Sequence, residues 1–168
     1  VSEMLSEIKV QLAFNYRFEK VVLLDGRDVS SGIRTPEVSM AASKISALPQ
    51  VRAYLLDLQR DIAKENNVIM DGRDIGTVVL PKADVKIFLT ATPEVRAQRR
   101  LDELVAKGQK ANFQQVLKDI QQRDYQDTHR EIAPLKMAKD SVKVDTSELD
   151  IEGVIAAIKE IIGKKIPL

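Results

Sequence analysis

Four residues with the chemistry of a binding site, Asp71-Gly72-Arg73-Asp74, follow directly after the short apolar run at 68–70. We expect that run to be a buried strand, and in an open α/β sheet ligands bind beyond the carboxyl ends of the strands. Two carboxylates and a guanidinium beside a glycine therefore form a candidate site at that edge. A solvated turn with a local ion pair explains the same residues, because the pattern D-G-x-D is not specific by itself.

Two stretches of predicted helix concentrate arginine, although the chain uses lysine freely elsewhere. A spacing of three to four residues places the members of each set on one helix face. The first set is Arg96, Arg99 and Arg100, and the second is Arg123, Asp124, Asp127 and Arg130. A guanidinium binds two phosphoryl oxygens at once and keeps its charge, which makes both faces candidates for phosphate binding. Solvated helix faces with ion pairs are the alternative interpretation.

The elements that would position these residues follow from apolar spacing, capping residues and turn residues. We predict helices at 1–9, 36–45, 49–64, 93–107, 113–128 and 151–162, and strands at 20–24, 68–70, 85–91 and 142–144. From residue 50 onward helices alternate with short apolar strands, which predicts a parallel sheet covered by helices. The first 45 residues instead contain a hairpin-like region around Asp25-Gly26. We therefore predict one part at 1–45 and an α/β core at 46–168.

Capping residues mark where several of these helices begin. Thr35 and Thr92 each precede a proline that suits the first helical position, and Asn112 and Asp150 are suited to cap two later helices. In the last helix we expect four isoleucines to form a buried stripe, at positions 151, 155, 158 and 162.

Composition limits the class of protein. The 168 residues are 44% hydrophobic and 30% charged, as in an ordinary globular protein with a sizeable core. The 26 basic and 25 acidic residues leave a net charge of +1, which argues against broad nucleic-acid binding. The absence of cysteine excludes disulfides and thiolate metal sites. Without a membrane-length apolar run or a signal-peptide pattern, we expect a cytoplasmic protein that binds neither membrane nor nucleic acid. We also expect a monomer, although the sequence does not determine the oligomeric state.

Three stretches, taken together, resemble the bacterial cytidylate kinases of the nucleoside-monophosphate kinase family. They are DVSSGIRTPEVSMAASKISALPQVR, VIMDGRDIGTVVLPKADVKIFLTATPEVRAQRR and QQRDYQDTHREIAPL. The resemblance covers the chain from about residue 10 to its end. It implies a P-loop NTPase-like α/β fold, with part of a monophosphate-binding insert at 1–45 and a short lid at about 97–110.

The resemblance also implies a reaction and its substrates. The γ-phosphoryl group of ATP would pass to CMP or dCMP, with Mg²⁺ as cofactor, in pyrimidine metabolism. Taken singly, each residue of the implied cytosine site is also explained without a ligand, as a helix-end residue, a surface charge or a turn former. The implied cytosine contacts are Ser43, Arg52 and Asp74.

The other implied roles concern the phosphates, the ribose and the metal. The residues implied to bind the acceptor phosphate or its vicinity are Arg73 and Arg130, with Arg34 as a further phosphate contact. Asp127 would bind the ribose hydroxyls. The residues implied to act in catalysis at the transferring phosphoryl group are Arg96, Arg99, Arg123 and Arg130. Asp71 would hold Mg²⁺ through water.

One departure from the family pattern concerns the phosphate loop. The family begins with a strand and a G-x-x-x-x-G-K-[ST] loop that binds the ATP phosphates, and no such motif occurs in these 168 residues. We therefore expect a truncated chain that holds the acceptor site and lid but is inactive alone. Two alternatives stay open: another P-loop small-molecule kinase, such as a shikimate- or gluconate-type enzyme, or a non-catalytic nucleotide-binding fragment.

Overall fold

The protein is described by a computed structural model that covers residues 2–46 and 48–166, without the side chains of Ser2, Pro36, Ser39, Met40 and Ser43. The chain forms two compact units, Val1–Val68 and Ile69–Leu168. The helix predicted at 49–64 belongs to the first unit. The predicted functional division into 1–45 and 46–168 is a different kind of boundary, and it stays a prediction.

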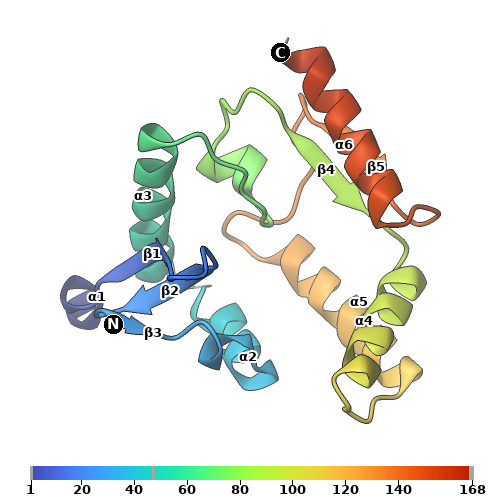
Figure 1. The fold of residues 1–168 in the computed structure, drawn as a ribbon, viewed down its shortest axis with the longest axis horizontal. Coiled ribbons are helices and arrows are strands. Elements are labelled where there is room, and N and C mark those ends of the chain that lie inside the picture. The colour runs from blue at the N-terminus through green and yellow to red at the C-terminus, as the bar shows by residue number, and fades with distance from the viewer. Residues whose placement is uncertain (1, 47, 167–168) are drawn as a thin grey trace. The chain divides into compact units, whose positions relative to one another are not determined.

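The first unit contains a three-stranded antiparallel sheet (Figure 1). Its strands, in order across the sheet, are β1 (Val10–Phe14), β2 (Lys20–Leu24) and β3 (Arg27–Asp28). Its helical elements are α1 (Ser2–Glu7), the 3-10 turn η1 (Gly32–Arg34), α2 (Pro36–Ile45) and α3 (Pro49–Glu65). Strand β1 is not among the predicted elements, because its apolar residues do not alternate strictly with polar ones.

The turn between β2 and β3 shows why Asp25-Gly26 is a turn signal. Asp25 and Gly26 have φ angles of 51° and 79°, as both central positions of a type I′ turn require. Glycine adopts this conformation without a steric penalty and aspartate tolerates it. Two residues therefore suffice to reverse the chain, and Leu24 pairs with Arg27.

The second unit contains a parallel sheet, as the alternating pattern predicts (Figure 1). Strand β4 (Ile87–Thr90) pairs with β5 (Val142–Asp145), and Thr90 lies opposite Asp145. Both strands therefore end at one edge, which is the ligand-binding edge of α/β sheets. The helical elements are one turn of π-helix, η2 (Ile75–Val79), and the α-helices α4 (Pro93–Ala106), α5 (Phe113–His129) and α6 (Ile151–Lys165).

The predicted capping residues are confirmed. In each cap the side-chain oxygen accepts a hydrogen bond from the amide three residues later, at 2.8 to 3.3 Å. The four caps are Thr35, Thr92, Asn112 and Asp150. After α4, Gly108 has a φ of 72°, which is the left-handed conformation that commonly ends a helix.

Residues 68–70 do not form a strand, so that prediction is wrong. The side chain of Ile69 is 97% exposed, and no sheet within the described residues includes this segment. A short apolar segment becomes a strand only where a neighbouring strand supplies partners for its backbone N–H and C=O groups. Apolar composition alone does not provide that partner.

The isoleucine stripe of α6 is less buried than predicted. Ile151 and Ile155 are exposed, whereas Ile158 and Ile162 are half-buried. Spacing decides which residues share a helix face, but burial depends on what covers that face. No helix in the described part of the chain, α6 included, is long and apolar enough to cross a bilayer.

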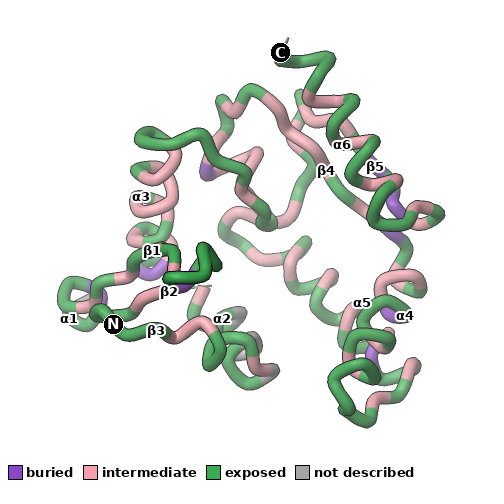
Figure 2. The backbone as a smooth tube through the Cα atoms, viewed as in Figure 1, coloured by how far each residue is buried: buried purple, intermediate pink, exposed green. Residues whose placement is uncertain are grey.

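In the second unit α4 and α5 pack closely against each other, and each includes a buried position (Figure 2). Ala97 on α4 has no exposed surface, and Val116 on α5 is also buried. The small side chain at position 97 allows a close approach to the backbone of α4. The two arginine-rich stretches described above lie on these two helices.

Enlarging the side chain at this contact should destabilise the fold. We expect Ala97→Leu to lower the free energy of unfolding by about 1–3 kcal/mol, because a filled core has no room for three more carbons. Urea denaturation measures the change. Ala106→Leu, at an exposed position of the same helix, is the matched control and should change stability by less than about 0.5 kcal/mol. Equal effects of the two substitutions would contradict this packing.

Candidate functional site

The turn Asp71-Gly72-Arg73-Asp74 leads directly into η2. A Cβ at position 72 would lie 2.8 Å from Cγ1 of Ile75, so any larger residue would force that side chain to move. The carbonyl of Asp74 accepts hydrogen bonds from the amides of residues 77–79, at 2.8 to 3.3 Å. Local packing and η2 therefore hold the backbone that carries Arg73 and Asp74.

Arg73 connects this turn to α5. Its Nε donates to Oδ2 of Asp127 at 2.9 Å, although the two residues are 54 apart in the sequence. The Asp127 side chain is 15% exposed and that of Arg73 is 42% exposed. The carboxylate is thus largely shielded, while part of the guanidinium remains accessible to an anionic ligand.

A second arginine–carboxylate contact joins the same two segments. Nη2 of Arg130, the residue that follows α5, lies 3.5 Å from Oδ1 of Asp74, and both side chains are largely buried. Nε of Arg130 donates to the carbonyl of Ala133 at 2.6 Å. Nη2 is buried and makes no hydrogen bond within the described residues. Arg130 is therefore oriented through Nε. Its Nη2 keeps a buried N–H group that could donate a hydrogen bond to a ligand oxygen.

The loop after α5 has the conformation needed to orient Arg130. Ala133 has a φ of 50°, which residues with a Cβ adopt rarely. The amide of Leu135 then returns to the carbonyl of Asp127 at 2.7 Å. Backbone outliers of this kind concentrate at functional sites, where the surrounding structure holds them.

Arg73, Asp74, Asp127 and Arg130 thus form one group, which we call the arginine–aspartate cluster. Each member was predicted from the sequence as a site residue, and the structure brings these four together. The cluster places two cationic donors beside two anionic acceptors. This arrangement suits a ligand that carries both an anionic group and hydrogen-bond donors.

Arg96 is held between α5 and the end of β4. Its Nη1 and Nη2 donate to the two oxygens of Asp124 at 2.8 and 2.6 Å, and its Nε donates to the carbonyl of Ala91 at 3.0 Å. The hydrogen bonds to Asp124 raise the pKa of Arg96 above its ordinary value. The charge of Arg96 is therefore fixed in place.

The remaining arginines on α4 have other partners. Arg99 donates to Thr146 and Leu149 in the loop between β5 and α6. Arg100 pairs with Glu103 along the helix at 2.6 Å, as the solvated-face interpretation expects. The phosphoryl-facing role of Arg99 stays a prediction.

Two other predicted residues of this unit are exposed. The side chains of Arg123 and Asp71 make no hydrogen bond or ion pair within the part of the chain that the structure describes. Neither is held by a neighbour, so either could take a ligand without first breaking a contact. Their predicted roles at the phosphoryl group and at Mg²⁺ stay predictions.

Three predicted residues belong to the first unit. Arg34 is exposed at the end of η1, and Arg52 on α3 donates from Nη1 to the carbonyl of Ser46 at 3.4 Å. The side chain of Ser43 lies outside the described residues. Their predicted roles as ligand contacts stay predictions.

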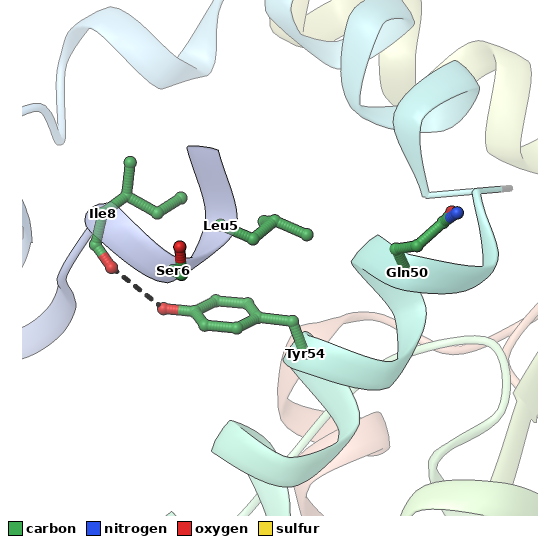
Figure 3. A pocket seen from close by; sticks show the side chains of 5 residues that line it. All are labelled: Leu5, Ser6, Ile8, Gln50 and Tyr54. Carbon is green, nitrogen blue, oxygen red and sulfur yellow. Dashed lines mark hydrogen bonds between the residues drawn. The ribbon is translucent and has the colours of Figure 1, made fainter. Parts of the chain in front are cut away.

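The first unit also has an open hollow between α1 and α3 (Figure 3). The residues that line it are Leu5, Ser6, Ile8, Gln50 and Tyr54. The Tyr54 hydroxyl donates to the carbonyl of Ile8 at 3.3 Å. This lining contains no charged side chain and none of the predicted site residues, so the hollow does not compete with the cluster as the candidate site.

Asp124 and Ala133 support the site, but neither was predicted to have a role in it. Asp124 lies next to Arg123 in the arginine-rich stretch, and its acidic side chain was a possible signal of a helix-to-helix pair. The contribution of Ala133 comes from its carbonyl, for which the side chain carries no signal. Only the following proline, Pro134, marks the position as an irregular turn.

Comparisons with known proteins agree on one family. The model of the family described as cytidylate kinase matches residues 1–164. The chain is 55% identical, over 144 residues, to a cytidylate kinase from Carboxydothermus hydrogenoformans, which covers 86% of this chain. It is 50% identical over 147 residues to a cytidylate kinase from Lactobacillus gasseri, which covers 88%.

A further relative matches along the whole chain. This cytidylate kinase, from Thermosipho melanesiensis, is 45% identical over 168 residues, which are 100% of this chain and 75% of the relative. For the Carboxydothermus and Lactobacillus relatives the match spans 65% and 64% of their own length.

The Arg96–Asp124 pair should couple α4 to α5 measurably. In a double-mutant cycle of Arg96→Met and Asp124→Leu, we expect a coupling energy of about 1 kcal/mol, the upper range for partly exposed pairs, because the geometry is bidentate. Urea denaturation of the four proteins measures it. The same cycle for Arg100→Met and Glu103→Leu, a pair along one helix, should give about 0.3–0.5 kcal/mol. A coupling near zero for Arg96 would contradict the contact.

Proposed function

This chain belongs to the cytidylate kinase family, and from that premise we propose that the protein transfers the γ-phosphoryl group of ATP to CMP or dCMP. The products are ADP and CDP or dCDP. The observation that supports this proposal is the arginine–aspartate cluster. It joins residues from two distant parts of the chain into one set of guanidinium and carboxylate groups, which suit the binding of a phosphate and a base.

Asp74 is the residue that we propose recognises the cytosine base. Cytosine presents an amino donor at N4, which a carboxylate accepts, and acceptors at N3 and O2, which suit the guanidinium of Arg52. Ser43 would add a further contact to the ring. Uracil reverses the pattern at positions 3 and 4, and each buried mismatch costs about 1–3 kcal/mol.

The two arginines of the cluster are the proposed acceptor-phosphate ligands. Arg73 presents an accessible part of its guanidinium, and Arg130 a buried nitrogen that lacks a hydrogen-bond partner within the described residues. Asp127, which Arg73 contacts, would accept from the ribose hydroxyls. Arg34 would contribute another phosphate contact from the first unit.

Transfer of the phosphoryl group requires positioning and charge stabilisation more than covalent chemistry. Arg96 suits such a task because its hydrogen bonds to Asp124 and Ala91 fix the charge before any ligand binds. Arg123 on α5 is proposed as the second positive charge. Closure of a lid at about 97–110 would exclude water from the reaction.

Asp71 is the proposed Mg²⁺ residue. No cluster of three or more histidine or acidic side chains in the described part of the chain could hold a metal ion. A single exposed carboxylate still fits, because Mg²⁺ usually takes one or two carboxylates and completes its shell with water and substrate phosphates. When bound, the ion would neutralise charge on the phosphates.

The cytosine assignment predicts a selective loss of base recognition. We expect Asp74→Asn to weaken CMP binding roughly 10- to 100-fold, because the amide cannot replace the charged acceptor. Isothermal titration with CMP, dCMP, UMP and AMP measures affinity and selectivity together. Asp84→Asn, at an exposed aspartate of the same unit, is the matched control and should bind CMP normally. Wild-type protein that bound UMP or AMP as tightly as CMP would contradict the proposal and favour another small-molecule kinase.

If Arg130 binds the acceptor phosphate, replacing it should weaken the binding of ligands that carry that phosphate. We expect Arg130→Ala to weaken CMP binding at least about tenfold while cytidine binding changes much less, because only CMP carries the charged partner. Arg130→Lys should recover part of the affinity, and Arg100→Ala should behave like wild type. Thermal unfolding checks the fold. Equal losses for CMP and cytidine, together with a collapse of thermal stability, would indicate a purely structural ion pair.

A further inference from the structure

The two edges of the antiparallel sheet in the first unit differ in how they are protected. Strand β3 forms one edge and consists of two charged residues, Arg27 and Asp28. Strand β1 forms the other edge (Figure 1), and its sequence VQLAF contains neither a charged residue nor a proline. Its pairing with β2 runs through five consecutive residues without a bulge. Short, charged or bulged edges resist pairing with other chains, so β1 is the edge that lacks this protection.

The backbone of β1 presents a regular set of hydrogen-bonding groups on its open side. In the hairpin, the amide of Asn15 donates to the carbonyl of Glu19 at 3.0 Å, and the amide of Asp25 donates to the carbonyl of Lys9 at 2.9 Å. Hydrogen-bonded pairs alternate along an antiparallel ladder, so the N–H and C=O groups of the odd-numbered residues of β1 face β2. Those of residues 10, 12 and 14 face away from β2, and no further strand of the described residues lies on that side.

Apolar side chains occupy the outward face of β1, where a solvated strand usually carries polar ones. Side chains alternate between the two faces of a strand. Ala13 lies opposite the buried Val21, which marks the packed face, so the side chains of Val10, Leu12 and Phe14 belong to the other face. Leu12 is 53% exposed and Phe14 is 68% exposed. Apolar residues that share an exposed face beside an open strand edge indicate an interaction surface.

Strand β1 is complementary to itself when a second copy lies antiparallel to it. A register centred on Leu12 places Leu12 opposite Leu12 of the second copy, and Val10 opposite Phe14 of the second copy. Each outward N–H or C=O group then meets its counterpart. Continued past the strand, the same register directs Arg17 at the hairpin tip toward Glu7 of the second copy. Both side chains are exposed and their charges are opposite, which favours this register.

We propose that β1 is an interface between two copies of this chain, which pair along their β1 strands about a twofold axis at Leu12. The pairing joins two three-stranded sheets into one sheet of six strands. A twofold axis lets the same surface serve both copies, as in most homodimers. The paired strands are short, so the dimer is weak and the expected monomer is the form at low concentration. This interface does not depend on the proposed kinase function.

Sedimentation equilibrium measures the association of this chain directly. We expect the average mass to rise toward that of a dimer as the protein concentration increases from roughly 10 µM to roughly 1 mM, as for a small transient interface. Over the same range, NMR should show amide exchange at residues 10, 12 and 14 slowing about tenfold, whereas residues 11 and 13 are already protected within the hairpin. A constant mass would overturn the proposal. A rise in mass without slower exchange at 10, 12 and 14 would also overturn it, because the contact would lie elsewhere.

Two variants at one position test the register itself. Leu12→Lys and Leu12→Glu each oppose like charges across the twofold axis, so each should stay monomeric, with thermal unfolding near wild type because the side chain is exposed. An equimolar mixture of the two should regain association, since opposite charges then face each other. Val105→Lys, at a similarly exposed position of α4, is the matched control and should associate like wild type. Association of either Leu12 variant at wild-type strength, or a mixture that stays monomeric, would contradict pairing at Leu12.

Discussion

Pairing of charges between the 71–74 turn and the end of α5 is the constraint on which the candidate site depends. Asp74 and Asp127 are both 15% exposed, and a carboxylate that has lost most of its water needs a positive partner. Arg73 and Arg130 supply that partner and, at the same time, keep donors that suit the proposed phosphate contacts. The cluster is close to neutral as a whole, so a ligand must exchange contacts with it rather than simply add charge. Such exchange favours ligands that match both the acids and the guanidinium groups.

Arginines that look equivalent in sequence have different tasks. Arg96, Arg99 and Arg100 follow one another within five positions of α4, yet one binds α5, one binds the loop after β5, and one pairs within its own helix. The first two turns of α4 are therefore tied to the sheet edge from two sides. If a lid moves during the reaction, the moving part would be the segment that follows Arg99 in the sequence, up to Gly108. Lysine would replace Arg96 or Arg99 only in part, because a single ammonium group cannot bind a carboxylate in parallel or reach three oxygens of a loop in fixed directions.

The fold could be predicted where local chemistry decides it. Thr35, Thr92, Asn112 and Asp150 start their helices because a side-chain oxygen next to the first turn accepts an otherwise unpaired amide. Prediction failed at 68–70 and along the first half of α6, where the outcome depends on neighbours that are distant in sequence. The residues of an apolar segment do not specify which strand pairs with it or which element packs over its apolar face.

The sequence by itself determined the residue types of the site, the helix starts, the turn at Asp25-Gly26 and the resemblance to one family. Each of these depends on residues within a few positions of one another, or on a pattern of residue types along the chain. Only the tertiary structure decided that Arg73 meets Asp127, that Arg96 meets Asp124 and that Arg99 holds Thr146. These partners are 54, 28 and 47 residues apart. A guanidinium can pair with any nearby oxygen, so the path of the whole chain selects which oxygen that is.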